Sequence, residues 1–227
     1  MTVTGAVEKK GIFDAMRKRL IAWGQQNFRK FPWRLTTDPY HILVSEILLH
    51  RTRAEQVVPF YLELIRRYPT VTSLAKAKLS DLEELLYPLG LRWRVEKMHL
   101  MAREIAERYG GIVPDKREDL LSLPGVSHYI AGAVLCFAYG KPEPLLDTNT
   151  VRVTGRLFGI PVTDSSRRSK RFRELMREFL DEDNPREFNY ALLDLAAIVC
   201  LKKSLPRCSV CPLKEFCRYF MGRKDHA

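Results

Sequence analysis

The sequence predicts an all-α fold, and three observations support this prediction. Apolar residues recur at helical spacing along most of the 227 residues, as in Ile12, Phe13, Met16, Leu20 and Trp23. Residues that favour helix starts precede several of these segments. There is no strand-rich region, internal repeat or low-complexity linker. A chain of this length forms one large domain or two small ones.

The periodicity and its breaks place each helix in turn. Asp38 is expected to cap the second helix with Pro39 in its first turn, and Ser80-Asp81-Leu82-Glu83 fits a capping box. Asp147 has the features of a helix N-cap. The expected helices cover residues 11–29, 39–48, 53–67, a short stretch within 70–78, 80–89, 92–109, 116–121, 128–138, 148–157, 166–181 and 187–200.

Charge favours a polyanionic partner. The formal net charge is +11, and basic residues are spread along the whole chain. Nucleic acid is the most common polyanion for such a protein, although plain solubility is the alternative explanation. No apolar run is long enough to cross a bilayer, and the N-terminus lacks the form of a signal peptide. We therefore expect a cytoplasmic protein without a membrane partner.

Four of the five cysteines form a cluster near the C-terminus. Cys200, Cys208, Cys211 and Cys217 are separated by seven, two and five residues. In a cytosolic protein this pattern favours a metal or cluster site over disulfides, and four thiolates can hold zinc or an iron–sulfur cluster. Cys136 lies far upstream and is interpreted as a small buried apolar residue.

A tight turn joins two predicted helices at Leu123-Pro124-Gly125-Val126-Ser127. The start of the second helix offers backbone N–H groups and a positive dipole end, which suit a phosphate. Gly125 can adopt the positive φ that such a turn requires. The alternative is an ordinary connection between two helices.

Two carboxylates are candidate catalytic groups. Asp147 can cap a helix, act in catalysis, or do both. Glu46 has Ile42, Leu43 and Leu49 among its helical neighbours, so it lies on a largely apolar face where burial favours a protonated carboxyl. The alternative for Glu46 is a partly buried side chain in a polar pair.

Taken together, the motifs resemble the helix-hairpin-helix (HhH-GPD) DNA glycosylase superfamily of the endonuclease III and MutY type. The signature is Leu123-Pro124-Gly125-Val126, then Ala131, then Asp147 followed by Val151-Arg152-Val153. The resemblance extends from about Phe31 to Cys217. It implies two helical lobes with a DNA-binding cleft between them. One lobe is contiguous, residues 38–145, and the other combines 1–37 with 146–227 and contains the cysteines.

The resemblance also implies roles in breaking the bond between sugar and base. Asp147 would stabilise the cation-like sugar, Glu46 would donate a proton to the leaving base, and Asn149 would support the aspartate and the attacking water. The stretch Ser45–Thr52 is similar to the catalytic-glutamate helix of MutY and of the mismatch glycosylases called Mig. Thr148 departs from the small residue usual there, which puts the fine orientation of the site in question.

Tyr129 occupies the position of the lysine that forms a Schiff base in endonuclease III. A tyrosine cannot form that imine, so the sequence predicts base removal without strong strand cleavage. Mig-type enzymes and some MutY proteins also have tyrosine here.

Further residues are assigned to DNA contacts by the resemblance. His50 and Leu91 would fill the space left by a flipped base, and Arg51 would contact the opposite base. For Leu91 a simple core position is an equal alternative. The other assigned residues would hold the DNA backbone: Leu123, Gly125 and Ser127 in the hairpin, and Lys202 and Lys203 beside the cysteines.

The cysteine pattern of endonuclease III has gaps of six, two and five and holds a 4Fe-4S cluster. This chain has one extra residue in the first gap, within the basic segment Leu201–Arg207, which is expected to bulge outward. By resemblance the cluster is structural. Zinc remains the alternative metal.

MutY proteins usually continue into a second domain, whereas this chain ends ten residues after Cys217. Together with Tyr129 and the Glu46 helix, this favours a Mig-like enzyme that acts on thymine or uracil opposite guanine in double-stranded DNA. A short MutY-like adenine glycosylase is the alternative substrate class. A non-catalytic iron–sulfur DNA-binding protein is the alternative of another kind. We expect a nucleoid-associated monomer.

Overall fold

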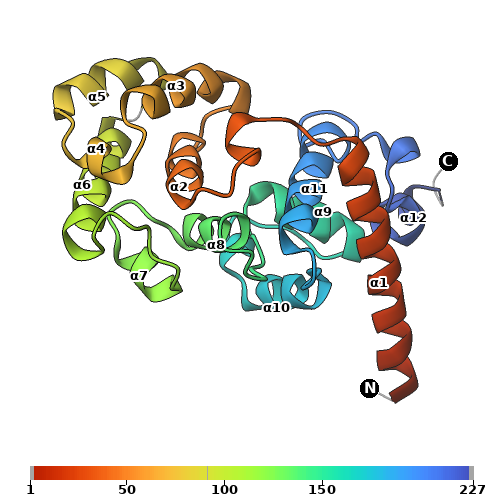
Figure 1. Ribbon diagram of the computed structural model, residues 1–227. Helices are drawn as coiled ribbons and strands as arrows, with labels where there is room; N and C mark the ends of the chain where they lie inside the picture. Colours follow the sequence, from red (N-terminus) through yellow and green to blue (C-terminus); the bar gives the residue numbers. More distant parts are fainter. Residues whose placement is uncertain (1–2, 91, 225–227) are drawn as a thin grey trace. The chain divides into compact units, whose positions relative to one another are not determined.

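The computed structural model describes residues 3–90 and 92–224, and within these ranges every regular element is a helix (Figure 1). The prediction of an all-α fold is confirmed. The chain divides into two compact units. One unit combines the N-terminal helix with the chain from Pro142 onward, and the other is continuous from Lys30 to Lys141. Within the described ranges, no helix has the length and apolar character needed to span a bilayer.

The continuous unit is built around one buried helix, α2. Eight of its ten residues are buried, because α2 packs against α3, α6 and α8 and so has apolar neighbours on several sides. The elements of this unit are η1 (Pro32–Arg34), α2 (Pro39–Leu48), α3 (Ala54–Arg67), α4 (Val71–Ala75), α5 (Leu79–Leu86), η2 (Tyr87–Leu89), α6 (Arg92–Arg108), α7 (Arg117–Ser122) and α8 (His128–Phe137).

The discontinuous unit is centred on α11, which packs against α1 and α9; Figure 1 shows α1 and α11 side by side. Edge-to-face and tilted contacts among Phe13, Phe158, Phe179 and Phe188 contribute to its core, with ring centroids 5.0–5.6 Å apart. The elements of this unit are α1 (Val3–Gln26), α9 (Thr148–Phe158), η3 (Ser166–Arg168), α10 (Lys170–Phe179), α11 (Pro185–Ile198), η4 (Cys208–Val210), η5 (Lys214–Phe216) and α12 (Arg218–Lys224).

Most expected helices are present. The predicted start of the first helix is wrong, because α1 begins at Val3 and not at residue 11, and most other helix ends differ by a few residues. The Asp38 cap is confirmed, since its side chain accepts hydrogen bonds from the amides of Tyr40 and His41. The capping box at Ser80 is wrong: α5 starts at Leu79, and Ser80 Oγ donates to Asp81 instead. A capping box occurs at Thr70, where Thr70 and Ser73 satisfy each other's backbone N–H groups.

The close approach of α1 and α11 depends on Gly24. A Cβ added to Gly24 would lie 2.4 Å from the Cβ of Ala191, which is far inside van der Waals contact. Gly11, in the same helix, is exposed and has nothing within 4 Å of such a Cβ. The two glycines therefore differ in packing while sharing helical backbone geometry.

This difference gives the first prediction. Gly24→Ala should lower the free energy of unfolding by about 1–3 kcal/mol, because the added methyl overpacks the helix interface. Gly11→Ala should raise it by about 0.5–1 kcal/mol, because alanine favours the helix. Urea unfolding of both variants checks this. Equal shifts in the same direction would contradict the packing argument.

Candidate active site

Asp147 is both a helix cap and an accessible carboxylate. Its Oδ1 accepts hydrogen bonds from the amides of Asn149 (2.8 Å) and Thr150 (2.7 Å), and its own amide donates to Thr150 Oγ1 (2.9 Å). This closes a capping box at the start of α9 and confirms that Asp147 is an N-cap. The other oxygen, Oδ2, accepts from Asn149 Nδ2 at 2.8 Å. The half-buried carboxylate is therefore fixed in orientation by two separate sets of bonds.

A chain of hydrogen bonds leads from Asp147 to the cysteine segment. Arg152 donates to Asn149 Oδ1 (3.0 Å), to the carbonyl of Ala196 (3.0 Å) and to the carbonyl of Cys200 (3.1 Å). Burial lowers the pKa of Arg152, while Cys200 and Asp147 act in the opposite direction. The sequence motif included Arg152 but gave it no role. Its position three residues after Asn149, on the same helical face, was the available signal.

The four cysteines line one cavity in the discontinuous unit. Cys200, Cys208, Cys211 and Cys217 share this cavity with apolar residues of α9 and α11, among them Val153 and Leu195. Burial raises the pKa of the Cys211 thiol to about 11, with the neighbouring cysteines adding to the effect. The described residues contain no group of three or more His, Cys, Asp or Glu side chains arranged to hold a single metal ion.

An arginine lies against the cysteines. Arg156 donates to Cys200 Sγ (3.3 Å) and to the carbonyl of Leu201 (2.8 Å), and its guanidinium lies 5.0 Å from the ring centre of Tyr219. Sequence reasoning did not identify Arg156. Arg156 therefore connects α9 to the first cysteine and to the loop that follows it.

The extra residue in the first cysteine gap lies in a loop that is closed at its base. The amide of Arg207 donates to the carbonyl of Val199 at 2.9 Å. Between these two residues, Lys202, Lys203 and Leu205 are exposed, Leu205 to 72%. The exposed part of this loop is therefore directed to the surface, while Pro206 in the same loop lines the cysteine cavity.

In the continuous unit, Glu46 lies in the buried part of α2. The side chain is 8% exposed, between Ser45 and Ile47, which are 1% and 4% exposed. Tyr129 is half-buried in the first turn of α8, the helix that packs against α2. Both residues thus belong to one helix pair, although their roles stay predictions.

The segment after α2 makes an unusual turn. Arg51 has φ 59°, the left-handed region that a non-glycine residue adopts only at a cost. The exposed His50 packs edge-on against Trp93, with ring centres 5.7 Å apart. Burial, Arg51 and Arg94 lower the pKa of His50, which favours its neutral form. Leu91, the other predicted wedge, lies outside the described residues.

The hairpin has the geometry that its sequence predicts. Gly125 has φ 81°, and a Cβ there would lie 3.1 Å from the Cβ of Lys97. Leu123 is buried at 3% exposure, and Ser127 caps α8 by accepting from the amide of Ile130 at 3.2 Å. In the described part of the chain, no internal hydrogen bond uses the exposed amides of Gly125 and Ser127.

Comparison with known proteins agrees with these features. Residues 44–178 match the family model of the "HhH-GPD superfamily base excision DNA repair protein". The chain belongs to this superfamily. It is similar to the thymine-DNA glycosylase of Aeropyrum pernix, 43% identical over 93% of this chain and 96% of that one. It also resembles the thymine/uracil-DNA glycosylase of Pyrobaculum aerophilum, 39% identical over 93% and 94%.

A solved structure shares the fold of this superfamily member. The structure of a thermostable thymine-DNA glycosylase matches with a TM-score of 0.87 and 33% identity, covering 96% of this chain and 99% of that one. Relatives named adenine DNA glycosylase match at lower identity than the thymine-DNA glycosylase of A. pernix.

The network around Asp147 gives the second prediction. Arg152→Lys removes the planar fork that serves three acceptors, so the free energy of unfolding should fall by about 2–4 kcal/mol. Arg173→Lys, an exposed change on α10, is the control and should stay within about 0.5 kcal/mol. Chemical denaturation measures both. Equal stability of the two variants would mean that the network adds nothing to the fold.

Proposed function

We propose that the protein is a monofunctional DNA glycosylase that hydrolyses the N-glycosidic bond of thymine or uracil opposite guanine. The observation that supports this most strongly is the orientation of Asp147: one oxygen caps α9 and the other is held by Asn149. The relatives named thymine-DNA and thymine/uracil-DNA glycosylases support the choice of base.

The reaction requires stabilisation of positive charge on the sugar. As the bond to the base breaks, the sugar becomes cation-like, and a fixed carboxylate nearby lowers the energy of that state. Asp147 is fixed before the substrate arrives, so it needs little reorganisation. Asn149 holds Oδ2 and helps to orient the attacking water, and Arg152 in turn holds the Asn149 amide.

The leaving base requires a proton or strong hydrogen bonds. Glu46 is buried in α2, and we propose it as the proton donor to the leaving base. We propose that Glu46 acts on the leaving base and Asp147 on the sugar. The different surroundings of the two carboxyl groups allow this division of roles.

Tyr129 limits the reaction to base removal. A phenol has no amine to attack the sugar and form an imine, so the abasic product leaves without strand cleavage. The half-buried ring can instead lie against the flipped nucleotide.

DNA is the proposed partner, held mainly through its backbone. The exposed amides of Gly125 and Ser127 suit one phosphate, with Lys97 close to Gly125. Lys202 and Lys203 on the cysteine loop add charge, in keeping with the net charge of +11. His50 and Leu91 are proposed to fill the space left by the flipped base, and Arg51 to contact the opposite base. We expect a nucleoid-associated monomer.

A 4Fe-4S cluster is the group proposed for the cysteine cavity. Four cysteines around one cavity match the ligand set of such a cluster, and the apolar wall excludes water. Zinc is the alternative metal for the same four thiolates. When bound, the cluster would join α9, α11 and the basic loop into one structure and would take no part in hydrolysis.

Two other functions stay open to test. A short adenine glycosylase would use the same carboxylates on a purine, since a few pocket contacts decide the base. A non-catalytic DNA-binding protein would keep the hairpin and the cluster without turnover.

The test of the function is a panel of labelled duplexes. These contain thymine, uracil or adenine opposite guanine, adenine opposite 8-oxoguanine, and thymine glycol, each read with and without alkali. Product from thymine or uracil that needs alkali supports the proposal. Product only from adenine favours the MutY alternative, and cutting without alkali would overturn the role of Tyr129. No product from any duplex would favour a binding protein.

The third prediction concerns Asp147. Asp147→Asn should reduce the single-turnover rate by about a thousand-fold, because the charge facing the sugar is lost. Asparagine caps helices about as well as aspartate, so folding and DNA affinity should be retained. Rate measurements with a binding titration check both. Full activity in this variant would exclude the proposed mechanism.

The fourth prediction concerns the metal. Purified protein should contain iron and sulfide in equal amounts, together with visible absorbance. Cys211→Ser should lose both and should lower thermal stability, because the ligand is replaced by a hydroxyl that binds iron poorly. Cys136→Ser, at a cysteine outside the cavity, is the control and should retain its iron. Zinc in place of iron would refute the cluster.

A further inference from the structure

Arg94 is a buried cation whose bonds all go to neutral oxygens. The residue is 2% exposed in the first turn of α6. Nη1 donates to the carbonyls of Leu48 (2.7 Å) and His50 (2.9 Å) and lies near that of Ile47 and the hydroxyl of Thr52 (3.4 and 3.2 Å). Nη2 donates to the carbonyls of Leu89 (3.2 Å) and Gly90 (3.3 Å). One guanidinium thus connects two segments about 40 residues apart in the chain.

The electrostatics of α6 do not explain why a positive charge lies at this position. A positive charge in the first turn of a helix opposes the dipole of that helix. It does stabilise the C-terminal end of α2, where the carbonyls of Ile47 and Leu48 point toward it. Burial lowers the pKa of Arg94, and in the described residues no carboxylate forms an ion pair with it. Burying an apolar side chain here would cost less free energy than burying a charged guanidinium. The hydrogen bonds of Arg94 therefore indicate a role other than filling the space.

The two connected segments are both strained or sharp turns. Arg51 lies in the left-handed region between His50 and Thr52, and each of these neighbours accepts a bond from Arg94. Gly90 has φ 69° and ends η2. The bonds to Arg94 therefore hold the Arg51 turn in a conformation that a non-glycine residue adopts only at a cost, and connect it to the glycine turn.

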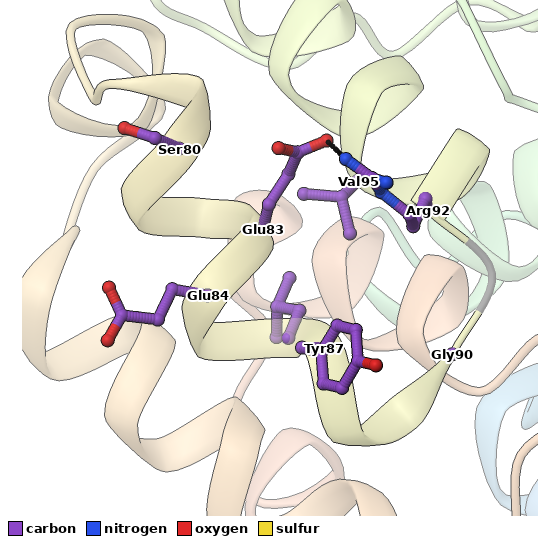
Figure 2. Close-up of a pocket in the computed structure, with 8 residues that line it drawn as sticks. Ser80, Glu83, Glu84, Tyr87, Gly90, Arg92 and Val95 are labelled. Atoms are coloured by element: carbon purple, nitrogen blue, oxygen red, sulfur yellow. Dashed lines mark hydrogen bonds and ion pairs between the residues drawn. The ribbon is translucent and has the colours of Figure 1, made fainter.

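The second turn borders a surface pocket of about 460 Å³ (Figure 2). Gly90 lies at one edge of the pocket, and the ion pair between Glu83 and Arg92 spans it at 3.3 Å. The Arg92 side chain is 74% exposed, so this ion pair is weak and does not fix the turn. Arg94 is the buried group that fixes it.

We propose that Arg94 is a positioning residue that holds the His50–Thr52 turn and the Leu89–Gly90 turn as one DNA-facing unit. This inference rests on the proposed function, which assigns His50 to the space left by the flipped base and Arg51 to the opposite base. Arg94 acts through these turns and not on the reacting atoms. Its loss should impair extraction of a base from a duplex far more than hydrolysis of a base that is already unpaired.

The experiment compares Arg94→Met, Arg94→Lys and a control, Arg103→Met, which removes an exposed arginine from the same helix. Single-turnover rates are measured on uracil opposite guanine in a duplex and on uracil in a single strand. Arg94→Met should lose about 30-fold or more on the duplex and less than about 3-fold on the single strand. Arg94→Lys should fall between, since one ammonium cannot serve both turns.

A second measurement is independent of activity. Trypsin cleavage after Arg51 should be about 10-fold faster in Arg94→Met than in the unaltered protein, because the turn opens locally. Cleavage after Arg173 in the other unit should be unchanged, and Arg103→Met should match the unaltered protein at both sites. A general loss of folding would accelerate all sites together.

The two measurements distinguish failure of the positioning role of Arg94 from failure of the proposed function. Equal loss on duplex and single strand, or unchanged cleavage after Arg51, would overturn the positioning role. Arg94→Lys behaving like the unaltered protein would show that charge alone suffices, and would also overturn it. If the unaltered protein removes no base, the function fails, while the trypsin measurement still decides whether Arg94 holds the turn.

Discussion

The bonds of the Asp147 side chain are the constraint on which the discontinuous unit depends. One carboxylate starts α9 by satisfying two amides, and the same group must face a sugar in the proposed reaction. Movement of the Asp147 side chain would break the bonds that cap α9. The stability of the fold therefore keeps the carboxylate in its orientation. Through Asn149 and Arg152 this order extends to the backbone of Cys200.

Arg94 and Arg152 make the same kind of contact, each within its own unit. Each is a guanidinium at least half removed from water that binds backbone carbonyls at the end of another element. The planar fork reaches acceptors from several directions, which lysine cannot do. In both cases an arginine holds backbone carbonyls next to residues to which the proposed function assigns a role.

Local rules account for what the sequence could predict. Asp38, Asp147 and the positive φ of Gly125 follow from neighbours within a few residues, so they were predictable. The prediction of a cap at Ser80 failed because α5 starts one residue earlier, at Leu79, so Ser80 lies inside the helix. Arg94 was missed because its acceptors lie about 40 residues away, and no local pattern records such contacts. The roles of Glu46 and Tyr129 come from resemblance and stay predictions.

The pairing of α1 with α11 has a consequence for synthesis on the ribosome. Lys30–Lys141 form a unit whose contacts are all available before the last third of the chain is made. By contrast, α1 is synthesised before this unit and its partner α11 after it. The apolar face of α1 therefore remains without its partner helix while more than 150 residues are added to the growing chain. A nascent chain of this protein exposes an early apolar helix, the kind of surface that chaperones bind.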